Sequence, residues 1–319
     1  MPLPTDEKIV ALSRNILAQF DTIFGLHPGF RPAHAKGVLV TGTFTPSSEA
    51  VSLTMAPHIL RPSVPVTVRF SDSTGLPTIR DNDPNAAPRG MAIRFFLAEH
   101  SHTDIVSHSI DAFPVHTGEE FLELLKAVAT SDPSTPSDPN HPKPIERYVA
   151  THPAALAFVQ ASKQTPSSFA RLTYYAITSF KFTNGKGVSR FGRYRVVPAA
   201  GNEFLDDAGA KAKGENYLFD DLKQRLARGP IEFGVMVQLA NDGDVTDDAT
   251  VHWPENRKVI ELGRIVLSKL VGDDAAQQKQ IIFDPIPRVT GIDPSADPLL
   301  ELRAAVYLLS GRRRRAAPA

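Results

Sequence analysis

Eight short runs rich in β-branched and aromatic residues recur along the chain, and they constrain its fold more than any other feature. They cover residues 37–44, 64–71, 90–98, 103–109, 174–183, 192–199, 231–240 and 259–268. The spacing between them is too irregular for a structural repeat. The sequence also lacks the long alternation of strands and helices with glycine-rich phosphate loops that is typical of a parallel sheet. We therefore predict an α+β fold built on a mostly antiparallel, eight-stranded β-barrel with helical insertions.

Helical patterns frame and interrupt the predicted strands. Residues 6–24 place apolar side chains at helical spacing behind Thr5, the predicted N-cap, and "HPG" at 27–29 ends this segment. Further helices are expected at 118–130, around 145–171 and at 297–311. The proline-rich stretch 131–144 predicts a surface loop. "TNGKG" at 183–187 predicts a hairpin turn, because it lacks the strand-to-helix context of a nucleotide-binding loop.

The composition excludes several classes of function. The 319 residues include 35 Lys and Arg against 35 Asp and Glu, so no net charge draws the chain to nucleic acid or to an anionic membrane. No cysteine occurs, which excludes disulfides, thiolate catalysis and zinc–thiolate or iron–sulfur sites. The first residues include Asp6, Glu7 and Arg14 where a signal peptide needs an unbroken apolar stretch. No run approaches the roughly 20 apolar residues of a membrane span. We expect a cytoplasmic protein with no membrane or nucleic-acid partner.

A histidine and a tyrosine stand out as candidate chemical groups. His34 lies in "FRPAHAKGVLVTGTF" (30–44), directly before the first predicted strand, where an apolar residue would serve a strand better. Arg303 lies four residues before Tyr307, so both share one face of a helix, and a nearby guanidinium favours an ionised phenol. Taken alone, His34 is equally well explained as a packed or surface residue. The arginine and the tyrosine are equally well explained as a surface cation–π pair.

Five motifs in register resemble the haem catalases. They are "RPAHAKG" (31–37), "VRFS" (68–71), "PRGMAIRF" (88–95), "IIFDPIPRVTGIDPSADPLLELR" (281–303) and "RAAVY" (303–307). Because the sequence is shorter than a full catalase, it is most similar to the catalase-related peroxidases, or mini-catalases. The resemblance implies a single catalase-like domain over 1–319, with a C-terminal haem-ligand helix. Residues 1–29 would form an N-terminal helical arm, and 30–314 the barrel and haem pocket.

The resemblance assigns roles to the two candidate groups. It implies a haem b cofactor whose iron is bound by Tyr307, with Arg303 beside the phenol. It also implies that His34 moves a proton between the two oxygens of bound peroxide, work suited to a ring whose pKa lies near the operating pH. Ser71 matches a serine that orients this histidine through a hydrogen bond.

Further positions match residues that hold the porphyrin in the family. The two haem propionates need cationic partners where they are partly buried. Arg31, Arg69 and Arg314 match the family's propionate-binding arginines. Phe113 and Phe121 align with aromatic residues that pack against the porphyrin, although core packing would explain them equally well. We expect the other arginines of the "GRRRR" tail to form a solvated basic end: Arg312, Arg313 and Arg315.

Three positions depart from the family pattern. An asparagine that donates to bound peroxide follows a "DLVG" stretch in the catalases, and here "DIVSHS" (104–109) places His108 there. Because histidine is bulkier and titrates near neutrality, we expect weak oxygen release unless the ring turns away to a backbone carbonyl. Along the family's substrate channel, Ser73 replaces a valine and Ala87 an acidic residue. These two changes predict a wider and less selective entry.

These features predict a haem-dependent peroxidase. It would reduce hydrogen peroxide or organic hydroperoxides and oxidise a small organic electron donor, with weak or no catalase activity. Three alternatives stay open: an allene oxide synthase-like hydroperoxide isomerase, a compact true catalase, and a non-enzymatic barrel that carries haem or another apolar ligand or has lost its cofactor. Since the sequence lacks the long wrapping segments of large catalases, we expect a homodimer.

Overall fold

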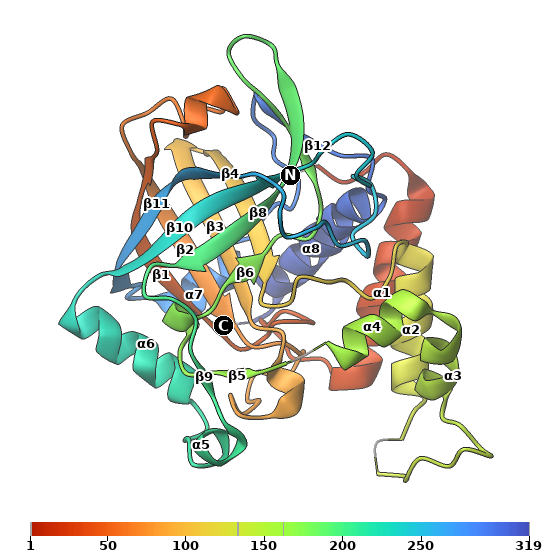
Figure 1. Ribbon diagram of the computed structural model, residues 1–319. Helices are drawn as coiled ribbons and strands as arrows, with labels where there is room; N and C mark the ends of the chain where they lie inside the picture. Colours follow the sequence, from red (N-terminus) through yellow and green to blue (C-terminus); the bar gives the residue numbers. More distant parts are fainter. Residues whose placement is uncertain (1, 133, 162, 319) are drawn as a thin grey trace.

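The computed structural model describes residues 2–132, 134–161 and 163–318, and its centre is a closed antiparallel barrel (Figure 1). Eight strands form it: β1 (Gly37–Pro46), β2 (Val64–Ser71), β3 (Gly90–Ala98), β4 (Ser101–His108), β6 (Tyr174–Tyr175), β8 (Ser189–Pro198), β10 (Ile231–Leu239) and β11 (Val259–Leu270). Neighbouring strands follow the order β10-β11-β1-β2-β3-β4-β6-β8, and β8 also pairs with β10, which closes the ring. The predicted α+β fold with an eight-stranded antiparallel barrel is confirmed.

Aromatic side chains fill the barrel, where alternate strand residues point inward and Phe169 enters from a 3-10 turn. The rings of Phe70 and Phe169 stack with centroids 5.4 Å apart, and Phe44 meets Phe95 edge-on at 5.1 Å. All four side chains are buried. Because the interior is a packed core, a functional cavity has to lie between the outer barrel wall and the surrounding helices.

A hairpin extends the barrel sheet at the top of Figure 1. In it, β7 (Phe180–Thr183) pairs with β8 and with β12 (Ile292–Pro294). Its tight turn is the predicted one, with the Asn184 N–H donating to the Val188 carbonyl at 3.0 Å. The predicted continuous strand 174–183 is wrong, because the chain breaks between β6 and β7, where Arg193 Nε donates to Ser179 Oγ at 3.3 Å. A separate two-stranded sheet joins β5 (Thr165–Pro166) to β9 (Phe204–Leu205).

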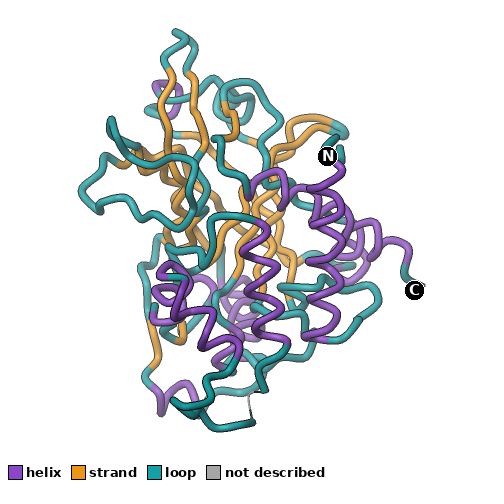
Figure 2. The backbone as a smooth tube through the Cα atoms, turned by 90° about the vertical axis from the view of Figure 1, so that its right-hand side faces the viewer, coloured by secondary structure: helices purple, strands orange, loops and turns teal. Residues whose placement is uncertain are grey.

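Three helices pack beside the barrel: α1 (Glu7–Phe24), α2 (Gly118–Ala129) and α8 (Leu299–Ala316). They share an apolar cluster that includes Ile16, Leu125 and Leu302. In Figure 2 this helical layer faces the viewer, in front of the strands. The predicted N-cap of α1 is wrong by one residue, because the Asp6 carboxylate accepts the Lys8 N–H at 2.8 Å. Among the described residues, no helix is long and apolar enough to cross a membrane.

Five further helices surround the barrel, and α6 among them contributes to its core. They are α3 (Pro144–Thr151), α4 (Pro153–Gln160), α5 (Asp207–Lys211), α6 (Tyr217–Arg228) and α7 (Asp274–Gln280), with 3-10 turns at Ala50–Ser52, Pro84–Ala86 and Phe169–Arg171. The sequence did not predict α5, α6 or α7. α5 and α7 bury no side chain, so their apolar periodicity is too sparse to be detected. The pattern of α6 is amphipathic, with Tyr217, Leu218 and Leu222 in the core, and it was missed. Residues 133 and 162, which fall in the predicted loop and the predicted helical region, lie outside the described residues.

Candidate active site

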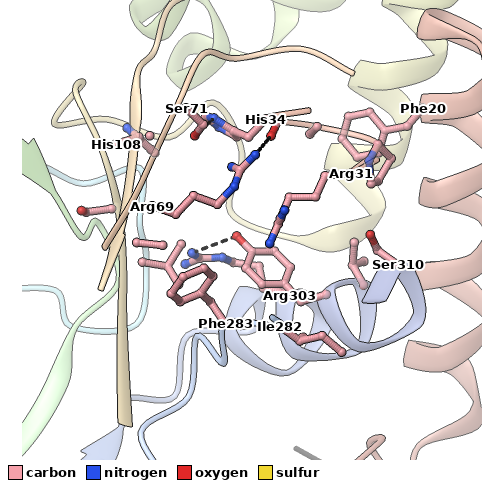
Figure 3. Close-up of a pocket in the computed structure, with 18 of the residues that line it drawn as sticks. Phe20, Arg31, His34, Arg69, Ser71, His108, Ile282, Phe283, Arg303 and Ser310 are labelled. Carbon is pink, nitrogen blue, oxygen red and sulfur yellow. Dashed lines mark hydrogen bonds between the residues drawn. The ribbon is translucent and has the colours of Figure 1, made fainter. Parts of the chain in front are cut away.

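A cavity of about 260 Å³ lies between the outer barrel wall and the helical layer. The two-residue repeat of β2 turns Arg69 and Ser71 toward it, whereas Val68 and Phe70 point into the barrel core. Figure 3 shows His34, Ser71 and His108 on one side of this cavity and Arg303 on the other. The apolar lining comes mainly from the helices and adjoining loops: Ile16, Phe20, Phe113, Phe121, Ile177, Leu299, Leu302 and Val306. The apolar lining therefore lies mainly on the helical side, where α8 adds the polar side chains of Arg303, Tyr307, Ser310 and Arg314.

The structure brings His34 and Ser71 into contact. His34 Nδ1 lies 3.1 Å from Ser71 Oγ, within hydrogen-bond distance. His34 itself has φ +55°, a left-handed conformation that is uncommon outside glycine. The following residue is tied across the site, because the Ala35 N–H donates to the Thr74 carbonyl at 3.0 Å. Tertiary contacts thus hold the ring in a fixed direction.

Gly90 makes room for this pair, a role that the sequence did not reveal. A Cβ atom there would lie 2.5 Å from Ser71 Oγ and 2.9 Å from His34 Nδ1. Both distances are below normal carbon contacts, so any side chain would displace one partner. The motif "PRGMAIRF" contains this glycine, but only the folded arrangement shows why it is needed.

The pKa of His34 differs from the near-neutral value that its expected role suggests. Burial is the main cause that lowers its pKa to about 3, and the nearby Arg69, His108 and Arg31 lower it further. The ring is therefore neutral at physiological pH, and it can accept a proton. Anionic groups bound beside these arginines would offset the repulsion that they exert on the protonated ring.

His108 lines the same cavity and does not turn to a backbone carbonyl. Its Nδ1 accepts the backbone N–H of Ile110 at 3.3 Å. A neutral ring with Nδ1 as acceptor carries its proton on Nε2. The expected titration near neutrality is wrong, because burial lowers the pKa of His108 to about 4, with a smaller effect from Arg303. At neutral pH, His108 therefore has one N–H donor.

Tyr307 and Arg303 lie on one face of α8, as their spacing predicts. The guanidinium of Arg303 donates to the phenol oxygen of Tyr307 over 3.5 Å, a long contact, and lies 5.8 Å from the ring centroid. Both side chains line the cavity. A positive charge is thus held beside the oxygen atom that would bind a metal.

Three arginines converge on the cavity without carboxylate partners among the described residues. Arg31 donates to the Gln278 and Ile281 carbonyls, Arg69 to the His34 carbonyl, and Arg314 to Ser310 Oγ. Burial is the main cause that lowers the pKa of Arg31 well below its usual range, and Arg69 and Arg314 add to this effect. The same burial lowers the pKa of Arg69 to about 9 and that of Arg314 to about 10.

These features fit a haem. Buried cations need anionic partners, and two propionates would supply them to the three guanidinium groups. The Nε atom of Arg314 is buried without a hydrogen-bond partner among the described residues, which leaves a donor for such a ligand. Phe113 and Phe121, with ring centroids 5.8 Å apart, give the cavity an aromatic, apolar lining against which a porphyrin could pack.

A polar network behind the arginines was also missed from the sequence. Arg69 Nε donates to Gln278 Oε1 at 2.8 Å, and Gln278 Nε2 donates to Asp274 Oδ2 at 2.6 Å. Asp274 in turn accepts the Leu39 N–H of β1 at 2.8 Å. Because Gln278 and Asp274 lie on α7, no signal in the sequence linked them to the site.

Five further residues considered from the sequence do not line the cavity. Ser73 and Ala87 do not line the cavity, because the chain turns away after Ser71 and the Ser73 N–H donates to the Ala86 carbonyl at 2.9 Å. The prediction that the tail arginines are solvated is wrong for Arg313, which forms an ion pair with Asp21 of α1 at 2.5 Å. Arg315 is exposed and donates to the Gln280 carbonyl at 3.0 Å, whereas Arg312 is exposed as predicted.

Comparisons with known proteins agree with this geometry. The catalase family model matches residues 29–318. The chain is 34% identical to a catalase-related peroxidase of Mycolicibacterium paratuberculosis, across 91% of this chain and 90% of that protein. It is 30% identical to a catalase-related peroxidase of Synechococcus elongatus, across 94% of this chain and 87% of that protein.

Solved catalases share the fold. A fungal catalase superposes with a TM-score of 0.78 at 21% identity, covering 93% of this chain and 61% of that one. Catalase A from Saccharomyces cerevisiae gives the same TM-score and identity, and 63% of it is covered. The chain thus spans about three fifths of the length of these two structures. From the extent of the family match and its identity to these relatives, the chain belongs to the catalase family.

Proposed function

We propose that this protein is a haem b peroxidase that reduces hydrogen peroxide or organic hydroperoxides at the expense of a small organic electron donor. One observation carries the proposal: a proton-accepting pair, His34 with Ser71, and a cation–phenol pair, Arg303 with Tyr307, line the same cavity. The names of its relatives, which are catalase-related peroxidases, support the same reaction class.

The cavity residues divide into those that would hold the haem and those that would act on peroxide. Tyr307 would bind the iron, and the three arginines described above would bind the propionates. Phe113 and Phe121 would pack against the ring. When bound, the haem supplies the electrons that cleave the peroxide bond and recovers them from the donor. The apolar side chains of the helical wall would exclude water from this site.

His34 would manage the proton. Its neutral ring can take the proton from one peroxide oxygen and return it to the other, so that water leaves instead of hydroxide. Ser71 would fix the direction of the ring through Nδ1, which leaves Nε2 for the substrate. His108 would donate one hydrogen bond from Nε2 to peroxide, in the place of the family asparagine.

His108 is also the reason to favour a peroxidase over a compact catalase. An imidazole occupies more space than a carboxamide, so a second peroxide is aligned less well for oxygen release.

We also propose that the protein forms a homodimer and that it is located in the cytoplasm.

The test combines an oxygen electrode with optical detection of an oxidisable aromatic donor. The haem-loaded protein should oxidise the donor with hydrogen peroxide and release little oxygen. A His34→Gln variant keeps a polar side chain but lacks the ring base, so it should retain haem and lose at least about 100-fold in rate. Vigorous oxygen release that the donor barely suppresses would instead identify a compact catalase. Isomerisation of a lipid hydroperoxide without donor would identify an allene oxide synthase-like enzyme.

A further inference from the structure

The wall around His34 is built from three separate chain segments, and each carries a charged residue next to a site residue. Lys36 lies two residues after His34, Asp72 directly follows Ser71, and Arg89 directly precedes Gly90. None of the three charged residues lines the cavity. Their side chains point away from it and meet in one cluster behind the wall.

The cluster is buried and tightly paired. Arg89 donates to Asp72 Oδ1 at 2.8 Å, and these two side chains are 3% and 0% exposed. Lys36 Nζ lies 2.5 Å from Asp81 Oδ1 and 3.8 Å from Asp72 Oδ2. Arg89 also donates to the backbone carbonyls of Ala86 and Asp81. The cluster therefore ties the segments around residues 36, 72 and 89 to one another.

These ties continue into the backbone that supports His34. The Asp72 N–H donates to the Lys36 carbonyl at 3.1 Å. The left-handed φ of His34 needs such support, because a non-glycine residue adopts it only where its surroundings enforce it. Contacts on both sides of the wall thus hold the ring against Ser71.

Stability alone does not explain a charged cluster at this place. Replacing a buried ion pair by apolar side chains of similar size is often neutral or stabilising, because charged groups lose hydration on burial. Charged hydrogen bonds, however, fix distances and directions more narrowly than apolar contacts do. The competing explanation is that the cluster serves to anchor α6, since Asp81 Oδ2 also accepts the Leu218 N–H at 2.7 Å.

We propose that Lys36, Asp72 and Arg89 are positioning residues for His34, and that their buried cluster sets the direction of the His34 ring toward the substrate. This inference rests on the peroxidase function proposed above. It assigns no contact with peroxide or haem to the three residues, which act through the backbone of the wall.

The test uses haem-loaded Lys36→Met, with Arg257→Met as the matched control. Arg257 forms an ion pair with Asp244 at 2.7 Å, and neither residue lines the cavity. Two quantities are measured: the rate of the haem absorbance change after addition of hydrogen peroxide, and the dissociation constant of cyanide. Cyanide enters as hydrogen cyanide and binds iron as an anion, so its affinity reports on the nearby proton acceptor without turnover.

Lys36→Met should slow the peroxide reaction and weaken cyanide binding by about tenfold each, because small displacements of a catalytic group are costly. Arg257→Met should change neither quantity more than about twofold, since its ion pair neither lines the cavity nor contacts the cluster behind His34. Lys36→Arg, which retains the charge, should restore both. Asp72→Ala should resemble Lys36→Met. Burial raises the pKa of Asp72, and alanine removes its contact with Arg89 in either protonation state.

Two results would overturn the proposal. One is that Lys36→Met and Asp72→Ala both fold, bind haem and match the wild type in both quantities. The other is that neither variant folds with haem, which would make the cluster a stability element. Failure of the proposed peroxidase function would give a different result. The wild type itself would then oxidise no donor, whereas its cyanide affinity would still report on His34.

Discussion

A Cβ atom on Gly90 would lie 2.9 Å from Nδ1 of His34, so β3 approaches the ring as closely as a glycine allows. We predict that Gly90→Ala displaces His34 or Ser71 and slows the peroxide reaction by about 10- to 100-fold. The free energy of unfolding should fall by about 1–3 kcal/mol, as for other overpacked sites. Stopped-flow absorbance and denaturant unfolding measure the two effects.

Gly185→Ala is the control for this variant, because a Cβ at Gly185 meets no atom within 4 Å. It should leave both the rate and the stability unchanged. Wild-type kinetics in Gly90→Ala would mean that His34 and Ser71 have more freedom than their 3.1 Å contact indicates.

Tyr307→Phe should remove the iron ligand while keeping the ring that packs on α8. We expect purified Tyr307→Phe to contain much less haem than the wild type and to show a shifted absorbance spectrum. Tyr148→Phe is the control, because Tyr148 donates to the Glu120 carbonyl and does not line the cavity. Equal haem content in wild type and Tyr307→Phe would contradict the assignment of the ligand.

Arg314→Met should have opposite effects with and without haem. In the haem-free protein it removes a buried cation that has no carboxylate partner among the described residues, so thermal stability should stay equal or rise. In the haem-loaded protein it removes a charge-assisted hydrogen bond, worth about 1.5–3 kcal/mol. Transfer of haem to an acceptor protein should then be at least about tenfold faster. The exposed Arg315→Met should show neither effect.

The sequence predicted the barrel well because its strands alternate regularly between core and exterior. Phe70 and Arg69 of β2 illustrate this, since one fills the barrel and the other faces the cavity. The break between β6 and β7 was not predictable, because no glycine or proline marks it in the sequence and its contact with Arg193 of β8 forms only in the folded chain. Likewise, α7 buries no side chain and contributes through polar contacts that only the folded chain forms.

Most predicted site residues came from local motifs, and the structure brings ten of them to one cavity: Arg31, His34, Arg69, Ser71, His108, Phe113, Phe121, Arg303, Tyr307 and Arg314. Their roles stay predictions until the variants above are measured. What local motifs could not give is the electrostatic environment. The lowered pKa of His34 depends first on burial and then on Arg69, which lies far from it in the sequence. Ser73, which is predicted along the substrate channel, does not line the cavity, because the chain turns away directly after β2.

His58 should make the protein sensitive to mild acid, independently of the active site. The ring is 2% exposed and lies 4.9 Å from the ring of Phe95, and its Nδ1 has no hydrogen-bond partner among the described residues. Burial lowers its pKa from 6.5 to about 4. The unfolded chain therefore binds a proton more readily than the folded chain does, and stability present above pH 6.5 is lost as the pH falls toward 4.

We expect His58 to account for about 2 kcal/mol of the stability lost between pH 7 and pH 5. His58→Leu keeps an apolar contact with Phe95 and has no titrating group, so its unfolding free energy should fall less over this range. Denaturant unfolding at both pH values measures the difference. His141→Leu, at a side chain 85% exposed, should retain the wild-type pH dependence. If wild type and His58→Leu lose equal stability, His58 is either already hydrated or finds a partner for its proton in the folded state.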